Sequence, residues 1–218
     1  TSLDGEEWSI TPVPTSPFRG IARGDSGFVA VGEGWVGTSL TGWDWQTQQA
    51  PTPFAINAVD YGGGLFIAAG VDGFMMSSAS GSSWDGRWSG TEDHLRDVLW
   101  DGAAWMVVGD GGTVLWSVDT TVWHIGSVLS DNDLRGVAAS LSTWVAVGDD
   151  GAIVVSDDRQ HWNGQLSGTE ADLRGVTWNG RAFTALGTRA VGDDGSEAVV
   201  LASWDGLHWT HFETEGAG

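Results

Sequence analysis

The chain has 218 residues, among them 34 Gly and 15 Trp, and it contains no Cys. Its 29 acidic residues outnumber the nine basic ones, which gives a formal net charge of −20. Nucleic acids and anionic membrane surfaces attract the opposite sign of charge, so we expect neither as a partner. The length suits one well-buried domain, and abundant Gly without a three-residue period is typical of many tight turns.

The absence of Cys excludes disulfides, thiolate nucleophiles and thiolate metal sites, and it leaves the redox compartment open. We expect an extracellular or cell-envelope location rather than a cytoplasmic one. No apolar run approaches the roughly 20 residues of a membrane span, and no signal-peptide pattern is present, so no membrane insertion is expected. The sequence leaves the oligomeric state open.

A Ser that stands six residues before a Trp recurs along the whole chain, and we call this pattern the Ser–Trp box. Its six copies are Ser2 and Trp8, Ser39 and Trp45, Ser78 and Trp84, Ser117 and Trp123, Ser156 and Trp162, and Ser203 and Trp209. The successive Trp residues are 37, 39, 39, 39 and 47 positions apart. A steady period with one insertion is the signature of a repeat architecture.

Residues 1–17 contain the first box and a Pro-rich connector, which predict an extra N-terminal strand, or half-repeat, and an extended link. Five full units follow, at approximately 18–50, 55–89, 94–128, 133–167 and 172–213, the last with an insertion around Thr188–Glu197. Each unit has four short β-prone runs separated by Gly, Asp or Asn turns. No helical periodicity is sustained, so almost no helix is predicted.

Four antiparallel strands per unit, repeated with an aromatic signature on the outer strand, predict an all-β fold. Specifically, we expect a five-bladed β-propeller that forms a single domain over residues 1–218. A β-sandwich is the alternative, but it does not explain a register kept over 39 residues. The sixth box is surplus to a ring of five, so either the N-terminal strand joins a blade edge or the chain is cut from a longer array.

Two boxes match a known repeat best: Ser2-Leu-Asp4-Gly5 before Trp8, and Ser203-Trp-Asp205-Gly206 before Trp209. They resemble the Asp-box, or bacterial neuraminidase repeat, and the propeller repeat of photosystem assembly factors. The resemblance implies a propeller whose boxes are folding devices: a carboxylate or hydroxyl binds the backbone N–H groups of a turn, and the Trp packs on the blade. We therefore interpret all six boxes as structural. The resemblance also implies a recognition or assembly role without a cofactor.

The second position of each first strand carries a basic or amide side chain. These residues are Arg19, Asn57, Arg96, Arg135 and Arg174. In a closed ring they would meet at one mouth of the central tunnel, where guanidinium groups can bind a carboxylate or phosphate. The alternative is that they pair with acids that follow the second strands, namely Glu33, Asp72, Asp110 and Asp149. The sequence leaves both alternatives open.

Two near-identical loops, Ser89–Asp93 and Ser167–Ala171, each precede a first strand. They indicate either a recent duplication or a repeated ligand site. Nine Trp residues do not occupy the repeating Trp position of the boxes. We expect most of them to pack between blades, although an exposed Trp face can bind a sugar or anchor a protein partner.

No catalytic residue and no metal site is predicted. Sialidases built on the Asp-box repeat use an Arg triad and a Tyr nucleophile on a six-bladed ring, whereas this chain has one Tyr, Tyr61, and five full units. Glycosidases need two facing carboxylates, but Asp60 and Asp97 stand at different positions of their strands. The five His residues show no metal-ligand spacing.

The favoured function is a non-enzymatic scaffold that binds a protein partner through one unique face, which the insertion at Thr188–Glu197 would mark. The first alternative is a multivalent lectin, which should repeat Trp, Asp and backbone groups in every groove between blades. The second alternative is a glycoside-active enzyme, which would need a carboxylate pair in the central cavity.

Overall fold

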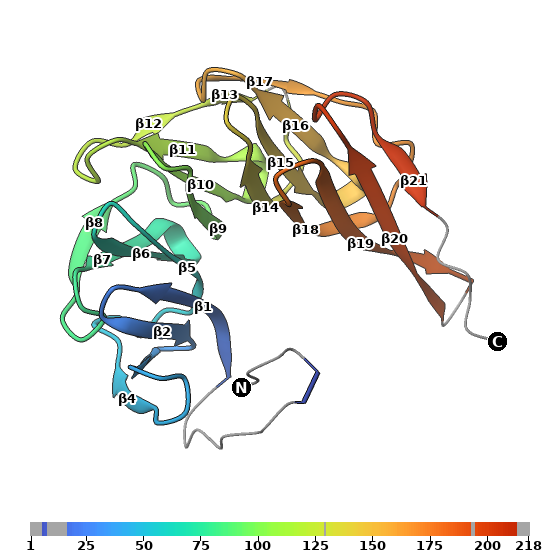
Figure 1. Cartoon of the computed structure of the whole chain (residues 1–218). Coiled ribbons are helices and arrows are strands. Elements are labelled where there is room, and N and C mark those ends of the chain that lie inside the picture. The colour runs from blue at the N-terminus through green and yellow to red at the C-terminus, as the bar shows by residue number, and fades with distance from the viewer. Residues whose placement is uncertain (1–5, 8–16, 129, 193–194, 213–218) are drawn as a thin grey trace. The chain divides into compact units, whose positions relative to one another are not determined.

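The computed structural model describes residues 6–7, 17–128, 130–192 and 195–212 (Figure 1). These residues form five sheets, and the only helical segments among them are three single 3-10 turns, so the all-β prediction is confirmed. The first box, Ser2 and Trp8, lies outside the described residues. The chain divides into two compact units, residues 1–92 and 93–218.

The first unit holds two antiparallel sheets whose strands follow chain order. One consists of β1 (Phe18–Gly24), β2 (Gly27–Gly32), β3 (Trp35–Ser39) and β4 (Gln46–Gln49). The other consists of β5 (Ile56–Gly62), β6 (Leu65–Gly70), β7 (Phe74–Ser78) and β8 (Asp85–Trp88), with the 3-10 turn η1 (Val71–Gly73) after β6. The first strands approach closely: a Cβ on Gly20 would lie 3.1 Å from the Cα of Ala58. Small residues are therefore needed where the two first strands meet.

The second unit holds the other three sheets. The third sheet consists of β9 (Leu95–Trp100), β10 (Trp105–Gly109), β11 (Val114–Ser117) and β12 (His124–Ile125), with η2 (Asp110–Gly112). The fourth consists of β14 (Leu134–Ala139), β15 (Trp144–Gly148), β16 (Ile153–Ser156) and β17 (His161–Gly164), with η3 (Asp149–Gly151). The fifth consists of β18 (Asp172–Trp178), β19 (Phe183–Val191), β20 (Gly195–Ser203) and β21 (Thr210–Phe212).

A fifth strand, β13 (Ser127–Val128), departs from the four-strand pattern and joins the fourth sheet parallel to β17. It follows β12 after a single residue, so one short segment pairs first with the third sheet and then with the fourth. A Cβ on the intervening Gly126 would lie 3.1 Å from Nε1 of Trp162. The segment therefore covers the outer edge of β17 and ties the two sheets together.

The insertion of the fifth repeat is also regular structure. β19 and β20 are nine residues long, and their pairing runs from Phe183↔Ser203 to Val191↔Gly195. The insertion thus extends the β19–β20 hairpin, because Thr188–Val191 and Gly195–Ala198 keep the antiparallel register.

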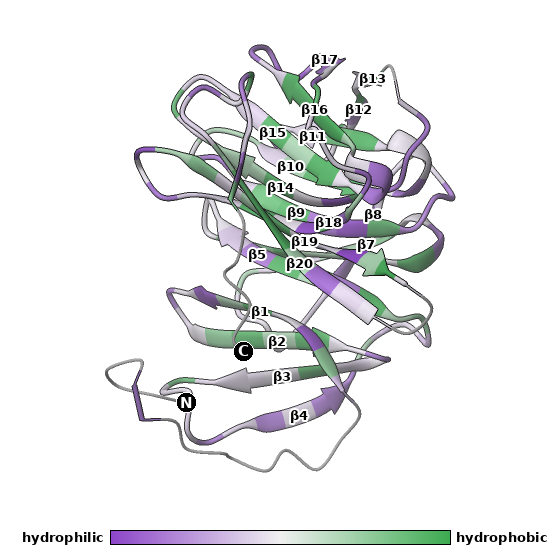
Figure 2. Cartoon of the chain, turned by 90° about the vertical axis from the view of Figure 1, so that its right-hand side faces the viewer, coloured by the Kyte–Doolittle hydropathy of each residue, from purple (hydrophilic) through white to green (hydrophobic). Residues whose placement is uncertain are grey.

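The cores lie between neighbouring sheets of the same unit. β10 and β15 are buried at every residue, as expected for strands covered on both faces. Val145, Leu173 and Phe183 belong to the cluster between the fourth and fifth sheets. Outer strands are polar instead, and Figure 2 shows this contrast between the apolar β2 and the polar β4.

Each described box forms a hydrogen-bonded turn between the third and fourth strands. The Ser hydroxyl is buried and accepts the backbone N–H three residues on, as Ser39 does from Gly42 at 2.8 Å. In the boxes that have an Asp two residues after the Ser, the carboxylate accepts two further backbone N–H groups. Asp205 Oδ1, for example, accepts those of Leu207 and His208 at 2.8 and 2.9 Å. The same turn closes in the other repeats at Ser78, Ser117, Ser156 and Ser203.

The box Trp anchors the turn from its other side. In four repeats its Nε1 donates to the carbonyl of the residue that the Ser holds, as Trp209 does to Gly206 at 2.8 Å. Trp123 differs: its Nε1 is buried without a hydrogen-bond partner among the described residues. The held residue needs a left-handed backbone and is usually Gly, but it is Thr120 (φ 63°) in the third repeat and Arg159 (φ 68°) in the fourth.

Candidate functional site

The arginines of the first strands lie opposite acids of their own sheets. In the fourth sheet Leu134 pairs with Gly148, and the residues that follow them, Arg135 and Asp149, meet with Nε 2.8 Å from Oδ1. The third sheet repeats this geometry, with Arg96 Nη2 2.6 Å from Asp110 Oδ2. These are bidentate pairs, which hold a guanidinium firmly.

In the first sheet, Arg19 reaches Glu33 at 2.7 Å and also donates to Asn57 Oδ1 of the second sheet at 3.2 Å. Both members of this ion pair are about half exposed, at 43% and 50%. Solvent therefore screens the pair more than it screens the pairs of the third and fourth sheets.

The second and fifth sheets change this pattern. Ile56 pairs with Gly70, so Val71 takes the register position that Asp110 and Asp149 hold in the third and fourth sheets, and Asp72 follows one residue later. Asn57 takes the position of the Arg in this repeat. In the fifth sheet Thr188 takes the acid's place, and Arg174 contacts Asp172 at 2.9 Å instead. At 54% exposure, Arg174 is the most accessible of these paired arginines.

The arginines of the second unit also share one electrostatic field. The hydrogen bond from Arg135 lowers the pKa of Asp149 despite partial burial, and the charges of Arg135, Arg174 and Arg96 lower it further. The same bond raises the pKa of Arg135. The structure therefore brings Arg96, Arg135 and Arg174 together among acids, and it places Arg19 beside Asn57 in the other unit.

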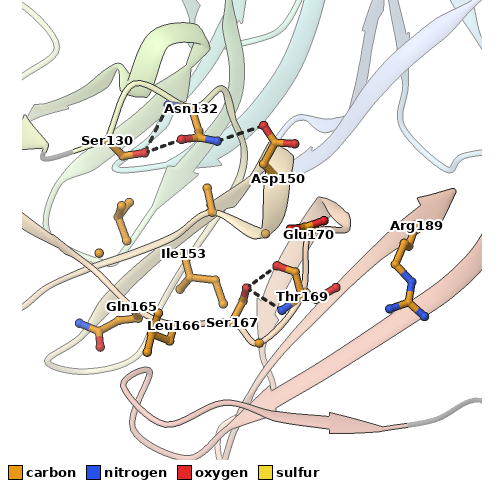
Figure 3. A pocket seen from close by; sticks show the side chains of 15 residues that line it. Ser130, Asn132, Asp150, Ile153, Gln165, Leu166, Ser167, Thr169, Glu170 and Arg189 are labelled. Atoms are coloured by element: carbon orange, nitrogen blue, oxygen red, sulfur yellow. Dashed lines mark hydrogen bonds between the residues drawn. The ribbon is translucent and has the colours of Figure 1, made fainter.

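A groove of about 700 Å³ lies in the second unit, and we call it the η3 groove (Figure 3). Its walls come from η3, from the start of β16, from the loop before β18 and from the extended β19. Its lining includes Asn132, Asp150, Ser167, Thr169, Glu170 and Arg189. The sequence singles out the loop and the insertion separately and does not indicate that they meet.

The near-identical loops use their hydroxyl groups to close their own turns. Ser167 Oγ donates to the carbonyl of Thr169 at 3.0 Å and accepts its N–H at 3.3 Å, and Ser89 does the same with Thr91. Each loop also packs on a 3-10 turn, because a Cβ on Gly151 would lie 2.0 Å from the Thr169 carbonyl. The shared sequence Ser-Gly-Thr-Glu therefore serves the loop conformation.

The charged groups of the η3 groove are mostly acidic. Asp150 is held in a left-handed conformation (φ 55°) and lies 3.4 Å from the amide nitrogen of Asn132. Glu170 is exposed. Arg189 is the one basic side chain that lines the groove, and it is paired with Glu197 across the hairpin at 2.6 Å. The 188–197 insertion was the only signal in the sequence for Arg189.

Carboxylates suggested for catalysis are engaged by the backbone. Asp97 Oδ2 accepts the N–H of Val137 from the neighbouring sheet at 3.0 Å, and Asp60 Oδ1 accepts that of Tyr61 at 2.7 Å. Within the part of the chain that the structure describes, no group of three or more His, Asp or Glu residues is placed to hold a metal ion. The same residues include no helix of the length and apolarity that a membrane span requires.

Comparison with known proteins identifies the type of fold of this chain. No protein-family model and no curated protein matches the chain. A structure described as YCF48 bound to D1 peptide superimposes with a TM-score of 0.66 at 15% identity, over 96% of this chain and 85% of its own. YCF48 from Cyanidioschyzon merolae gives 0.61 at 13% identity, over 93% and 87%. YCF48 has a β-propeller fold. The present chain has a propeller-type fold.

The same fold occurs in a very different setting. A chain from an S. cerevisiae assembly of dbp5, nup159 and gle1 gives a TM-score of 0.56 at 11% identity, over 91% of this chain and 62% of that one. Identities this low carry the fold but no site residue. The η3 groove therefore has to be judged on its own geometry.

A pocket of the first sheet shows whether the other repeats have a groove like the η3 groove. It measures about 420 Å³ and occupies the corresponding place, beside Gly34 and Thr52. Its lining includes Trp35 and two Pro residues, whereas the η3 groove has Ala152 and Leu166 and no Trp. A pocket therefore occurs at the same position of both sheets, but the two pockets are lined by different side chains.

Proposed function

We propose that this chain is a non-enzymatic, propeller-type scaffold that binds a protein partner in the η3 groove. One observation carries the proposal: the groove adjoins the extended β19–β20 hairpin, and no other sheet among the described residues has such an extension. A surface that occurs once suits a single partner, whereas a site formed by the repeat itself would recur in every sheet.

The comparisons support the class of partner. One similar structure is described as bound to a peptide, which makes a protein segment the natural ligand class to test first. The five sheets support a five-bladed ring, and the Ser and Asp hydrogen bonds of the box turns support membership of the Asp-box repeats. Both remain parts of this proposal, as does an extracellular or cell-envelope location.

Among the five positions predicted to bind a ligand at the tunnel mouth, Arg174 is the one we retain. Its guanidinium is more than half exposed, and Thr188 stands where the third and fourth sheets have an acid. An acidic group of a partner can therefore approach Arg174 without displacing a bidentate pair. The other three arginines are committed to Glu33, Asp110 and Asp149.

The test is a binding survey of the purified chain against two ligand classes. A displayed library of random peptides and a glycan array are both screened, each at low and at high salt because of the −20 charge. We expect peptides of related sequence to be enriched and to bind saturably, and the array to stay blank. Saturable binding of one sugar class that survives high salt would establish a lectin, and a library without enrichment would refute the proposal.

A further inference from the structure

The hairpin extension leaves one side of β19 without a neighbouring strand among the residues that the structure describes. The pairing of β18 with β19 ends at Asp172↔Thr188, whereas the pairing of β19 with β20 continues to Val191↔Gly195. Arg189, Ala190 and Val191 are all exposed. Three residues of regular strand therefore present an open edge on the β18 side.

The register shows which backbone groups face that edge. In the third and fourth sheets the corresponding residue donates its N–H toward the first strand: Asp110 to His94 at 2.9 Å and Asp149 to Asp133 at 3.0 Å. Thr188 has the same register with Asp172. Alternate residues of an antiparallel strand direct their N–H and C=O to the same side, so Ala190 faces the open edge with both groups.

The η3 groove lies between the loop that leads into β18 and the extended β19. The chain before β18 turns away toward η3, where Gly151 donates its N–H to the carbonyl of Ala171 at 2.8 Å. The groove is consequently lined by Thr169 and Glu170 from that loop and by Arg189 from the hairpin (Figure 3). An extended segment in this position would continue the line of β18 beside β19.

The charges of the groove favour a basic segment. Asp150 and Glu170 supply two carboxylates, and the charge of Arg189 is balanced by Glu197 at 2.6 Å. A second copy of the chain carries the same charge of −20, and the mutual repulsion disfavours pairing of two hairpins. A Lys or Arg side chain near Glu170 would instead gain an attractive interaction in a partly enclosed site.

We infer that the η3 groove binds an extended, basic peptide segment that adds as a strand to the open edge of β19. Backbone hydrogen bonds to Ala190 would give affinity, and Glu170 and Asp150 would select the positive charge. This inference rests on the proposed function, because it names the partner chemistry and the binding mode of the same groove.

The experiment uses three labelled nine-residue peptides and fluorescence anisotropy at low and physiological salt. The first alternates Val or Thr with Lys, the second replaces each Lys by Glu, and the third is the Lys peptide with alternate backbone nitrogens methylated. We expect only the first to bind well. Methylation removes the strand hydrogen bonds and should weaken binding about tenfold or more.

Three variants of the full chain locate the site. The double variant Asp150→Asn with Glu170→Gln should weaken binding of the Lys peptide about tenfold. Glu92→Gln is the matched control. It removes the equivalent carboxylate from the other Ser-Gly-Thr-Glu loop, which precedes β9, and the strand that pairs with β9, β10, ends at Gly109 without an extension. It should leave binding of the Lys peptide unchanged. Replacing residues 189–197 by a two-residue turn between the paired Thr188 and Ala198 should abolish binding with little change in Tm.

Four results would overturn the inference: equal binding of the methylated peptide, equal or better binding of the Glu peptide, binding that survives the shortened hairpin, and a dimer that depends on the hairpin. If none of the three peptides binds while library-selected peptides do, the inference fails and the proposed function stands. If the library also yields nothing, both fail.

Discussion

Arg159 and Asp101 form an ion pair that joins the fourth sheet to the third. Nε of Arg159 lies 2.7 Å from Oδ2 of Asp101, whose side chain is only 1% exposed. The same oxygen accepts Nε1 of Trp144 at 2.7 Å, and the guanidinium lies 4.2 Å from the centre of that indole. Burial raises the pKa of Asp101, but the hydrogen bonds from Arg159, from the backbone of Ala104 and Ala103 and from Trp144 outweigh it, so the pKa lies below its usual value.

Asp101→Asn should lower the free energy of unfolding by about 3 kcal/mol, because removing one member of a buried pair leaves the other charge uncompensated. Urea denaturation at neutral pH measures the effect. Asp157→Asn is the matched control: it changes the same charge at an exposed position of the box turn that carries Arg159, and it should shift the midpoint little. Equal midpoints for both variants would contradict the role of the pair.

The box carboxylates should make stability depend on acid pH. Backbone hydrogen bonds from Val122 and Thr121 lower the pKa of Asp119 to about 2, below the value of about 3.9 in an unfolded chain. A depressed folded-state pKa contributes stability that is fully present above about pH 4 and is lost as the pH falls toward about 2. An NMR titration of the Asp119 carboxyl carbon, identified with Asp119→Asn, should give a midpoint near 2; a midpoint near 4 would show that the turn does not bind the carboxylate.

The Arg–acid pairs should be energetically coupled. Arg135→Asn alone leaves Asp149 and Asp133 without their counter-ion, whereas Arg135→Asn with Asp149→Val reproduces the combination that the second sheet has at Asn57 and Val71. We expect the double variant to be more stable than additivity of the single variants predicts, by about 1–2 kcal/mol. Chemical denaturation of the four proteins of the cycle measures this.

The same double-variant cycle at Arg19 and Glu33 measures how solvent exposure changes the coupling energy of such a pair. Because these side chains are 43% and 50% exposed, their coupling should stay below about 1 kcal/mol. Coupling that is equal at the two sites would show that burial does not set the strength of these pairs.

Thr120→Gly should stabilise the protein by about 1 kcal/mol. A β-branched residue with φ 63° is strained, and Gly relieves the strain at the position where the first, second and fifth repeats already have Gly. Thr121→Gly is the control next to it, where no positive φ is required. It should destabilise by about 0.5–1 kcal/mol, through the unfolded chain and through loss of the Thr121 side-chain hydrogen bond to Asp119. Thermal unfolding of both variants decides the matter; a lower Tm for Thr120→Gly would mean that packing of the buried Thr120 side chain outweighs the strain.

The period of the Ser–Trp box was sufficient to predict the all-β structure and the four-stranded units, because each repeat carries its own turns and its own apolar runs. It also predicted where the turns lie: Asp25 and Ser26 separate β1 from β2 as the turn residues suggested. The box hydrogen bonds follow from residues three positions apart, which sequence spacing shows directly.

The sequence was less informative wherever two segments far apart in the chain meet. It gave no sign of β13, whose two residues pair with β17, a strand of the following repeat. The role of Asp101 was equally invisible, since Arg159 lies 58 residues away.

The sequence by itself determined the repeat, the strand composition, the box turns and the acidic surface, since these depend on interactions within one unit of about 39 residues. Only the tertiary structure decided that the insertion is a continued hairpin, that each first-strand Arg lies against an acid, and that Glu170 and Arg189 line one groove. The physical reason is register: a strand pair and a neighbouring loop meet through packing between sheets, and a shift of one residue redirects every side chain that such packing brings together.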